Sequence, residues 1–429
     1  MAASRSARAS TTRATARDRE VGLVGLTDLE VAWREEWGRL LALLVARFRR
    51  LDLAEDALAD AFAKAADTWG RDGTPDNPAA WLLTTARRRA LDRLRGEAVA
   101  VRKQPLLEVD AALTEEARTV MADAGEPLLD ERLRLVLLCA HPSLAPEHAA
   151  ALTLRLVLGI PTEDIARLFL VPRATMAARL TRARKSLAGE RFEVPSGADL
   201  EARVATVADV AYLAFTAGYA PGSGSDLLRV ELAGEAIRLV RVLRSVLPPG
   251  FAGGGDLDAL LALMLLQHAR RDARVRDGRP VLLPDQDRSR WHLDEINEAI
   301  DLLTPLAAAP STPYLLQALI AAEHGIAPVV GATDWPRIAG WYAELEGLTG
   351  SPVVRLNRAV ALAETDGPDA GLRLLEGLEL PGHRLPATRA ELLARAGRTD
   401  EAATVYALAI ARCDNEVERA HLQERLGGL

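Results

Sequence analysis

Apolar residues recur at the spacing of a helix face along most of this sequence. The first run consists of Trp33, Trp37, Leu40, Leu41, Leu44 and Phe48. Aromatic residues make up only 4% of the chain, and alanine, leucine and arginine dominate it. Helices pack readily through small residues, whereas sheets are enriched in aromatic and β-branched side chains. The pattern therefore predicts an all-α protein.

Size and charge limit the class of protein further. A chain of 429 residues exceeds one ordinary core and predicts several domains. No run approaches the roughly 20 apolar residues of a membrane span. The two cysteines, Cys139 and Cys413, are far apart, which predicts buried free thiols rather than a disulfide scaffold. These features indicate a cytoplasmic protein.

Start and stop signals divide the first hundred residues into three helices. The letters TDLE at 27–30 form a capping box for the first helix. The second runs over 52–69, where GRDGTPDNP breaks it, and the third over 77–95, with a capping asparagine followed by proline. We expect one three-helix domain over residues 25–100. The Arg- and Ser-rich residues 1–24 superficially match a transit peptide but offer no apolar face, so we interpret them as a disordered tail.

A second small domain is expected over residues 127–190, after an irregular charged linker at 101–126. Its expected helices are 129–139, 146–158, 162–169 and 173–187. The last two helices form a helix-turn-helix with a turn at Leu170, Val171 and Pro172. Ile165, Leu168 and Phe169 on the first can pack against an apolar stripe on the second, made of Met176, Leu180, Ala183 and Leu187. The stripe leaves a polar face made of Arg173, Thr175, Arg179, Arg182, Arg184 and Lys185.

The one-signed charge of this face distinguishes it from an ordinary solvated surface. Charged helix faces are usually just solvated, but a merely soluble face mixes signs, and the segment from Val171 to Leu187 has no acid although the net charge of the chain is -7. Each lysine or arginine that contacts the DNA backbone releases a condensed counterion, and this release favours binding. We therefore expect the face to bind DNA.

The first domain has two further charged surfaces. From Thr84 to Lys103 seven basic residues stand against two acidic ones, with Trp81 just before them. The preceding helix has an acidic edge at Glu55, Asp56 and Asp60, which suits a basic protein partner rather than DNA. Basic elements on two separate domains suggest contact with two stretches of one nucleic acid.

These segments together resemble a bacterial sigma factor of the extracytoplasmic-function type, in the sigma-70 family. LAEDALADAFAKAADTW resembles the polymerase-binding helix of that family, and NPAAWLLTTARRRALDRLR its promoter-melting helix. GIPTEDIARLFLVPRATMAARLTRARKSL resembles its minus-thirty-five helix-turn-helix, and all three occur in the order of the family. Further segments, including FEVPSGADL and DQDRSRW, resemble a subgroup with a C-terminal tetratricopeptide-like extension.

The resemblance implies core RNA polymerase and promoter DNA as partners, with no cofactor, metal or enzymatic activity. The β′ clamp helices would face Glu55, Asp56, Asp60 and Lys64, and the β flap would also contact the chain. The minus-ten strands would meet Trp81, Arg87, Arg88 and Arg95, with a base held by the loop from Gly70 to Asn77. The minus-thirty-five element would be read by the polar face described above. This chain departs from relatives at Ala177 and Ala178, which are usually polar, and at Thr216–Tyr219, where relatives have NEGY.

Residues 202–429 form the larger part of the chain, after a linker at 191–201. Over about 310–429 we expect tetratricopeptide-like hairpins, with Gly397 at a turn, Ala402 where two helices touch and Tyr406 in the groove between them. Ala370 and Ala339 would occupy the place of Ala402 in the two preceding units. The resemblance implies that this extension regulates activity, and that a small YCII-like (DGPF-type) protein is a companion.

One polar cluster in the extension is open to several interpretations. It contains Asp285, Asp287, Arg288, Arg290 and Trp291. His292 stands beside these residues, but a hydrolytic or metal site is disfavoured because no second His or Cys lies nearby at ligand spacing. A structural ion-pair network with the arginines beside the aspartates and a docking surface remain equal alternatives.

Two other classes of function are kept as alternatives to a sigma factor. One is a helix-turn-helix regulator that binds DNA without entering polymerase, and the other is a repeat-type protein-interaction adaptor. The acidic edge at Asp56 and Asp60 separates them, because a free-standing regulator has no use for it.

Overall fold

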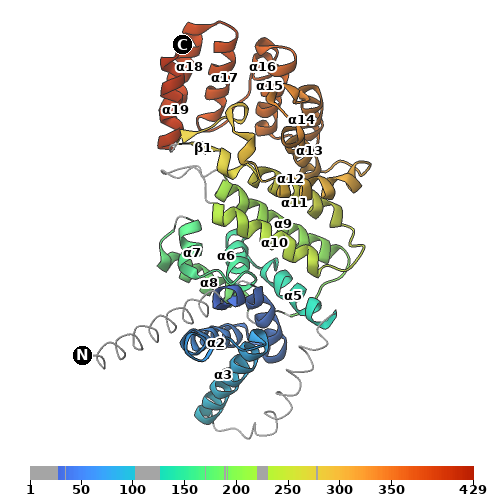
Figure 1. The fold of residues 1–429 in the computed structure, drawn as a ribbon, viewed down its shortest axis with the longest axis vertical. Helices are drawn as coiled ribbons and strands as arrows, with labels where there is room; N and C mark the ends of the chain where they lie inside the picture. Colours follow the sequence, from blue (N-terminus) through green and yellow to red (C-terminus); the bar gives the residue numbers. More distant parts are fainter. Residues whose placement is uncertain are drawn as a thin grey trace, which may run out of the picture. The chain divides into compact units, whose positions relative to one another are not determined.

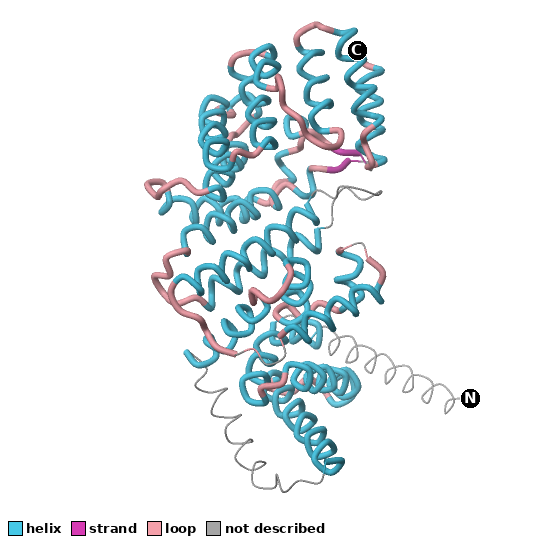
Figure 2. Tube along the Cα trace, turned by 180° about the vertical axis from the view of Figure 1, so that it is seen from behind, coloured by secondary structure: helices cyan, strands magenta, loops and turns pink. Residues whose placement is uncertain are grey.

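The computed structural model describes residues 28–33, 35–101, 126–169, 171–187, 190, 192–219, 230–276 and 279–429. Within these ranges the chain is overwhelmingly helical, which confirms the all-α prediction. The described exception is one antiparallel pair, β1 (Val275–Arg276) and β2 (Arg279–Pro280), drawn in magenta in Figure 2. The expected tail at 1–24, the capping threonine at 27, Leu170, Arg102 and Lys103 all lie outside the described residues.

The chain divides into two compact units, residues 1–207 with 245–249, and residues 208–244 with 250–429. The first unit begins with a helix over residues 28–33 and 35–48, followed by α2 (Leu51–Asp72) and α3 (Pro78–Val101). The predicted stripe of the first helix is confirmed, since Trp37, Leu40, Leu41 and Leu44 are completely buried. These apolar faces together make the core of the three-helix domain.

The break between α2 and α3 comes later than the sequence predicts. Gly70 remains helical, because glycine within a helix costs only about 1 kcal/mol relative to alanine and does not by itself end the helix. The helix ends where Gly73 adopts a φ of 87° and its N–H donates to the carbonyl of Trp69. As predicted, Asn77 begins α3, because its Oδ1 accepts from the N–H of Ala80 at 3.0 Å.

The second small domain contains α5 (Glu126–Cys139), α6 (Pro146–Leu156), α7 (Thr162–Leu168) and α8 (Arg173–Ser186). The helix-turn-helix prediction is confirmed, because Met176, Leu180, Ala183 and Leu187 are all buried. Helix α6 ends two residues earlier than expected, and Gly159 follows it with a φ of 72°. This turn directs the chain into α7.

From α9 (Ala198–Tyr219) and α10 (Val230–Val246) onward the chain is again helical. Helix α11 (Gly254–His268) is apolar on nearly all sides and almost wholly buried, as expected for a central helix. Packed against it are α12 (Leu293–Leu303) and α13 (Pro313–Ile326). Single 3₁₀ turns lie between these helices at Arg271–Ala273, Leu283–Asp285, Arg288–Arg290 and Thr304–Leu306, and another follows α13 at Val330–Ala332.

The last six helices pack in chain order as hairpins (Figure 1). They are α14 (Trp335–Thr349), α15 (Pro352–Thr365), α16 (Pro368–Leu374), α17 (Arg384–Arg395), α18 (Thr399–Ala411) and α19 (Glu416–Gly427). Gly397 turns with a φ of 74°, and Ala402 and Tyr406 are buried, as the repeat pattern predicts.

The repeat register is wrong by one residue in the preceding hairpin. Ala370 is only half-buried, and the close contact is made by Gly371 instead. A Cβ at Gly371 would lie 2.6 Å from the carbonyl oxygen of Ala359, so α15 and α16 approach too closely there for any larger residue. Ala339 does pack beside the cluster of Ile320, Ile338 and Ala361.

Cys139 and Cys413 are both free and buried, as predicted. None of the described helices has the length and apolar character needed to cross a bilayer.

Candidate nucleic-acid and polymerase interface

The exposed face of α8 is cationic where the sequence predicts it. Arg173, Thr175, Arg182 and Lys185 are exposed, and the buried stripe on the opposite side fixes their direction. Helix α8 has no acidic residue in its first turn, so Arg173 stands at the start of the helix without a neighbouring carboxylate on that turn. This end of a recognition helix is the part that reaches base edges in a major groove.

Two other arginines of α8 are held by carboxylates of the protein. Arg179 Nη2 lies 3.0 Å from Glu147 Oε2, its guanidinium is 6.0 Å from the Phe169 ring, and only 14% of its side chain is exposed. Arg184 donates to the carboxylate of Glu55 on α2 through both Nε and Nη2. In this arrangement both side chains must first leave a protein partner to contact DNA.

Helix α3 presents only part of its predicted basic set to solvent. Arg88 is exposed, and Arg95 donates to Asp92 at 3.2 Å. Arg87 is 6% exposed and lies in the core of the domain. Burial of Arg87 is explained by its position on the same helix face as the buried Leu83 and Leu91.

The start of α3 is held by contacts within the protein. Trp81 is half-buried and meets the edge of Trp69 with ring centroids 5.7 Å apart. Asn77 uses its side-chain oxygen to cap the helix, and Thr74 donates to Asp28 Oδ2 at 2.6 Å. The loop between α2 and α3 is therefore tied at both ends, which keeps the exposed part of Trp81 in a fixed place.

Three of the four predicted polymerase-facing residues lie on an exposed edge of α2. Asp56 accepts from Arg93 Nη1 at 2.5 Å, and Asp60 lies 3.6 Å from Arg93 Nη2. The hydrogen bond to Asp56 raises the pKa of Arg93. Lys64 is exposed one turn further on. Because these pairs are exposed, they are weak and can be exchanged for a basic partner surface.

Glu55 differs from its neighbours because it is only 6% exposed. Its Oε1 accepts from Arg155 Nε at 2.7 Å, and its Oε2 accepts from Arg184 Nη2 at 2.6 Å and from Arg184 Nε at 3.0 Å. Arg155 comes from α6 and Arg184 from α8, so one carboxylate of the first domain binds two cations of the second. Sequence reasoning missed Arg155, although a single arginine within the apolar run AALTLRL was a detectable signal.

A close apolar fit surrounds this ion triad. Trp33 Nε1 donates to the carbonyl of Gly159 at 2.8 Å, and the guanidinium of Arg155 lies 5.1 Å from the Trp37 ring. A Cβ at Gly38 would lie 2.1 Å from the carbonyl oxygen of Val157, and one at Gly159 would lie 2.6 Å from the Trp37 ring. Glycine is therefore required on both sides of the junction between the two domains. We call this group of contacts the α2–α8 junction.

The polar cluster of the extension is built largely as a structural network. Arg288 donates to the carbonyls of His324 and Ala327 at 3.0 and 2.6 Å, and its guanidinium lies 4.3 Å from the Trp291 ring. Trp291 is 6% exposed. Asp287 makes its hydrogen bonds with Ser289, and the charge of the neighbouring Arg290 has a smaller effect on its pKa than these bonds. Its carboxylate accepts from the N–H and hydroxyl of Ser289 and so caps a 3₁₀ turn, which lowers its pKa.

Asp285 and Arg290 remain exposed beside this network. His292 belongs to the cluster seen in the sequence, and the structure adds His268, which the sequence spacing did not indicate. His292 Nε2 lies 2.8 Å from Asp272 Oδ2, and this hydrogen bond lowers the pKa of Asp272. His268 Nδ1 lies 3.0 Å from Glu295. Each of these rings is held by a carboxylate of the protein.

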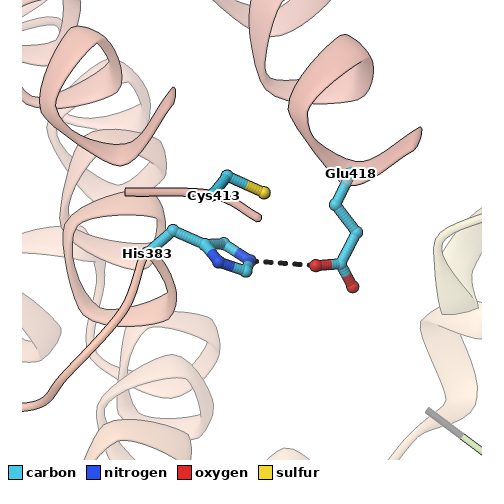
Figure 3. A group of neighbouring side chains, drawn as sticks. All are labelled: His383, Cys413 and Glu418. Carbon is cyan, nitrogen blue, oxygen red and sulfur yellow. Dashed lines mark ion pairs between the residues drawn. The ribbon is translucent and has the colours of Figure 1, made fainter. Parts of the chain in front are cut away.

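One further group in the extension combines donors that a zinc ion accepts. His383, Cys413 and Glu418 offer atoms within 4.8 Å of one another, as Figure 3 shows. His383 Nε2 pairs with Glu418 Oε2 at 3.0 Å, and the Cys413 thiol donates to the carbonyl of Asn415 at 3.4 Å. Burial raises the pKa of this thiol. The three donors already have protein partners, which tie the start of α17 to the α18–α19 turn.

Comparison with known proteins gives three matches to family models. Sigma-70 region 2 matches residues 34–99, sigma-70 region 4 matches residues 134–187, and a family of unknown function (DUF6596) matches residues 203–307. An uncharacterised protein of Rhizobium meliloti (strain 1021) is 38% identical over 403 residues, which are 91% of this chain and 93% of that protein. No solved structure matches the chain. None of these matches supports the YCII-like companion that the resemblance implies.

The two sigma-70 matches fall on the helices described above. Region 2 covers the acidic edge of α2 and the basic helix α3, and region 4 covers the helix-turn-helix of α7 and α8. The extension match begins after them, in α9. With both regions present and in order, and with a relative similar over nearly its whole length, the chain belongs to the sigma-70 family of sigma factors.

Proposed function

We propose that this protein binds core RNA polymerase and directs transcription from specific promoters, with its helical extension regulating that activity. The observation that carries the proposal is the exposed cationic face of α8, at Arg173, Arg182 and Lys185, on a helix-turn-helix whose stripe is buried. Each of these cations can replace a counterion of the DNA backbone. Such a protein acts in the cytoplasm as a transcription factor, not as an enzyme.

Each charged surface then has its own task. The face of α8 reads the minus-thirty-five element, with Arg173 nearest the base edges. On α3, Trp81 stacks on an unpaired base of the minus-ten element while Arg88 and Arg95 contact the backbone. Asp56, Asp60 and Lys64 on α2 meet the clamp helices of the polymerase. Asn77 contributes by capping α3. Arg87 is buried, so its role is in the core of the domain rather than in direct contact with DNA.

The principal alternative is a helix-turn-helix regulator that never enters polymerase. The solvent-accessible carboxylates of Asp56 and Asp60 favour the sigma factor, because they repel DNA and suit a basic protein partner. A protein-interaction adaptor that does not bind DNA would not explain the exposed cations of α8.

Run-off transcription on fragmented genomic DNA tests the proposal, because the fragments together offer every promoter of the genome to the polymerase. Purified full-length protein and core polymerase are combined, and the 5′ ends of the transcripts are mapped. We expect start sites that share two sequence blocks upstream. The double variant Asp56→Lys/Asp60→Lys should abolish initiation while its far-ultraviolet circular dichroism stays unchanged.

A matched reversal of two exposed carboxylates in the extension, Glu376→Lys/Glu379→Lys, should initiate as the wild type does. Sequence-specific duplex binding by the wild type without any polymerase-dependent start site would favour the regulator instead. Normal initiation by the Asp56→Lys/Asp60→Lys variant would show that α2 does not bind polymerase through this edge.

A further inference from the structure

We propose that His383, Cys413 and Glu418 form a zinc site in the extension, and that the bound ion fixes α17, α18 and α19 to one another. The proposal goes beyond promoter recognition and does not depend on it. In the described part of the chain, these residues are a group whose donor atoms converge to within 4.8 Å of one another (Figure 3). Imidazole nitrogen, thiolate sulfur and carboxylate oxygen are the ligands that Zn²⁺ takes in proteins.

The fold brings the three donors together from separate elements. Helices α17 and α18 form a hairpin that turns at Gly397. His383 directly precedes α17 and Cys413 lies just after α18, so both stand at the open end of this hairpin. Glu418 lies in the first turn of α19, which packs on α18. An ion bound by all three side chains would close the hairpin and hold the start of α19 to it.

The separations of the donor atoms suit a four-coordinate ion. With zinc–nitrogen and zinc–oxygen distances of about 2.0–2.2 Å and a zinc–sulfur distance of about 2.3 Å, tetrahedral ligand atoms stand about 3.5 Å apart. His383 Nε2 and Glu418 Oε2 are 3.0 Å apart, and all three donors are within 4.8 Å. Shifts of little more than about 1 Å would therefore complete the shell, with water as the fourth ligand.

Neighbouring side chains fix the backbone that carries two of the ligands. Asn415 is buried, and its Oδ1 accepts from the N–H of Glu418 at 3.0 Å and so begins α19. Arg419 Nε donates to the carbonyl of Cys413 at 3.0 Å. Outer residues that hold metal ligands in place raise the affinity for the ion. The site is therefore supported from the polar residues around it as well as formed by its own three donors.

Charge and exposure also favour a divalent cation at this place. A thiolate from Cys413 and the carboxylate of Glu418 together balance the two charges of Zn²⁺, so that no net charge is buried. Cys413 is 4% exposed, whereas the side chains of His383 and Glu418 are 18% and 36% exposed. The ion can therefore enter from the solvent side of the histidine and the glutamate, where water supplies the fourth ligand.

Binding replaces existing hydrogen bonds by bonds to the metal. The Cys413 thiol gives up its hydrogen bond to the carbonyl of Asn415, its proton goes to solvent, and the sulfur binds as a thiolate. The His383 imidazole binds through Nε2 and keeps its one proton on Nδ1. Zinc then takes the place of the direct contact between Nε2 and the Glu418 carboxylate.

Zinc binding by the full-length, untagged protein tests the site. A chelator first removes metals, and Zn²⁺ is then titrated in competition with a chromogenic zinc indicator. We expect one Zn²⁺ per chain with a dissociation constant below about 1 μM. X-ray absorption of this complex should show one sulfur at about 2.3 Å from the metal. A shell of nitrogen and oxygen alone, or no binding below this limit, would overturn the site.

Cys413→Ser is the principal variant, because serine is close in shape and keeps a donor for the carbonyl of Asn415 but is a poor zinc ligand. His383→Gln removes a second ligand. Each should weaken zinc binding by more than about 100-fold, the upper end of the effect of a residue that only supports a ligand. Circular dichroism checks that they fold, and the wild-type absorption spectrum decides the question if one does not.

Two matched variants should bind zinc as the wild type does. Cys139→Ala removes the other thiol of the chain, and Glu416→Gln changes an exposed carboxylate in the same first turn of α19. Equal zinc affinities for Cys413→Ser and the wild type would show that the ion is bound elsewhere and would overturn the assignment.

Amide hydrogen exchange tests whether the ion fixes the three helices. At a zinc concentration of about 100 times the dissociation constant, amides of α17, α18 and α19 that exchange by opening of the site should slow by up to about 100-fold. Amides of α3 should be unaffected, and zinc should change nothing in Cys413→Ser. Zinc bound through sulfur without slower exchange in these helices would overturn the proposed role of the ion.

Discussion

Burial changes the chemistry of several single side chains in the extension. The phenol of Tyr406 is removed from water and donates to Glu391 at 2.7 Å, which raises its pKa to about 12. Burial also raises the pKa of Tyr342 to about 12. His324 is affected in the opposite direction, because burial and the nearby Arg270 and Arg288 lower its pKa to about 4. These groups stay neutral near pH 7 and act as packing elements.

His324 makes the stability of the extension sensitive to acid. Its pKa is about 4 in the folded protein and 6.5 as the ordinary value, so below pH 6.5 the unfolded chain binds a proton that the folded chain refuses. The free energy of unfolding should therefore fall as the pH decreases from about 6.5 to 4, by at most about 3 kcal/mol from this residue.

Urea unfolding at several pH values measures this effect. His324→Gln should show a smaller decrease across that interval than the wild type. His421→Gln, a half-buried histidine on α19, is the matched control and should follow the wild type. Parallel pH profiles for His324→Gln and the wild type would contradict the prediction.

At the scale of elements, the approach of neighbouring helices depends on small residues. Helix α16 contacts α15 through Gly371, which is buried and whose absent Cβ would meet Ala359, Leu392 and Ala363 within 3.1 Å. By contrast, Gly347 in α14 has open space around it. The same substitution therefore has opposite consequences on two helices.

Gly371→Ala should lower the free energy of unfolding by about 1–3 kcal/mol, because overpacking outweighs the gain in helix propensity. Gly347→Ala should raise it by up to about 1 kcal/mol, since only the propensity changes. Thermal and urea unfolding of the two variants gives the comparison. A stabilised Gly371→Ala would mean that α15 and α16 separate without cost.

Helix α8 should combine two kinds of DNA contact. Arg173→Ala, at the start of the helix, should cost about 1–3 kcal/mol at one base-pair position and relax the preference there. Arg182→Ala should weaken binding to all sequences and reduce the slope of log K against log salt by about 0.9.

Thr181→Ala is the control for α8, because the hydroxyl of Thr181 is exposed and donates to the backbone of its own helix. Binding of these variants to a mapped promoter, measured over a range of salt concentrations, distinguishes the two roles. Equal losses on all sequences for both arginine variants would assign Arg173 to the phosphate backbone as well.

The features that could be predicted from the sequence are those that depend on local residue patterns. The stripe from Met176 to Leu187 obeys the spacing of one helix, and the cap at Asn77 depends on residues three positions apart. The ion triad of Glu55, Arg155 and Arg184 could not be predicted in this way. Glu55 and Arg184 are 129 residues apart in the sequence and meet only through tertiary packing. The repeat register failed at Ala370 for the same reason, since the approach of α15 selects Gly371.

At the scale of the molecule, the part that matches sigma-70 regions 2 and 4 is followed by a larger C-terminal extension. Both sigma-70 matches end before residue 188, and the remaining helices include the match to a family of unknown function. Repeated helical hairpins commonly present surfaces for protein partners. We therefore propose that a regulatory signal reaches the DNA-binding domains through the extension.

Removal of residues 198–429 should change initiation by at least about fivefold at equal protein concentration, the lower end of a typical coupling between sites. A chain that ends at Gly197 keeps Phe192, which accepts from Arg49, so the first unit loses none of the contacts of the α2–α8 junction. Thermal unfolding establishes that the shortened chain folds. Identical transcript levels from the two chains would reject regulation by the extension.

The indole pair at Trp33 and Trp37 gives this protein a native optical signal. The two rings stack with centroids 4.4 Å apart, and Trp37 is entirely shielded from water. If the neighbouring domain moves away, these rings become hydrated, and their emission should shift to longer wavelength without any added dye. The rate at which the two domains separate could then be followed in real time by stopped-flow fluorescence when polymerase is added.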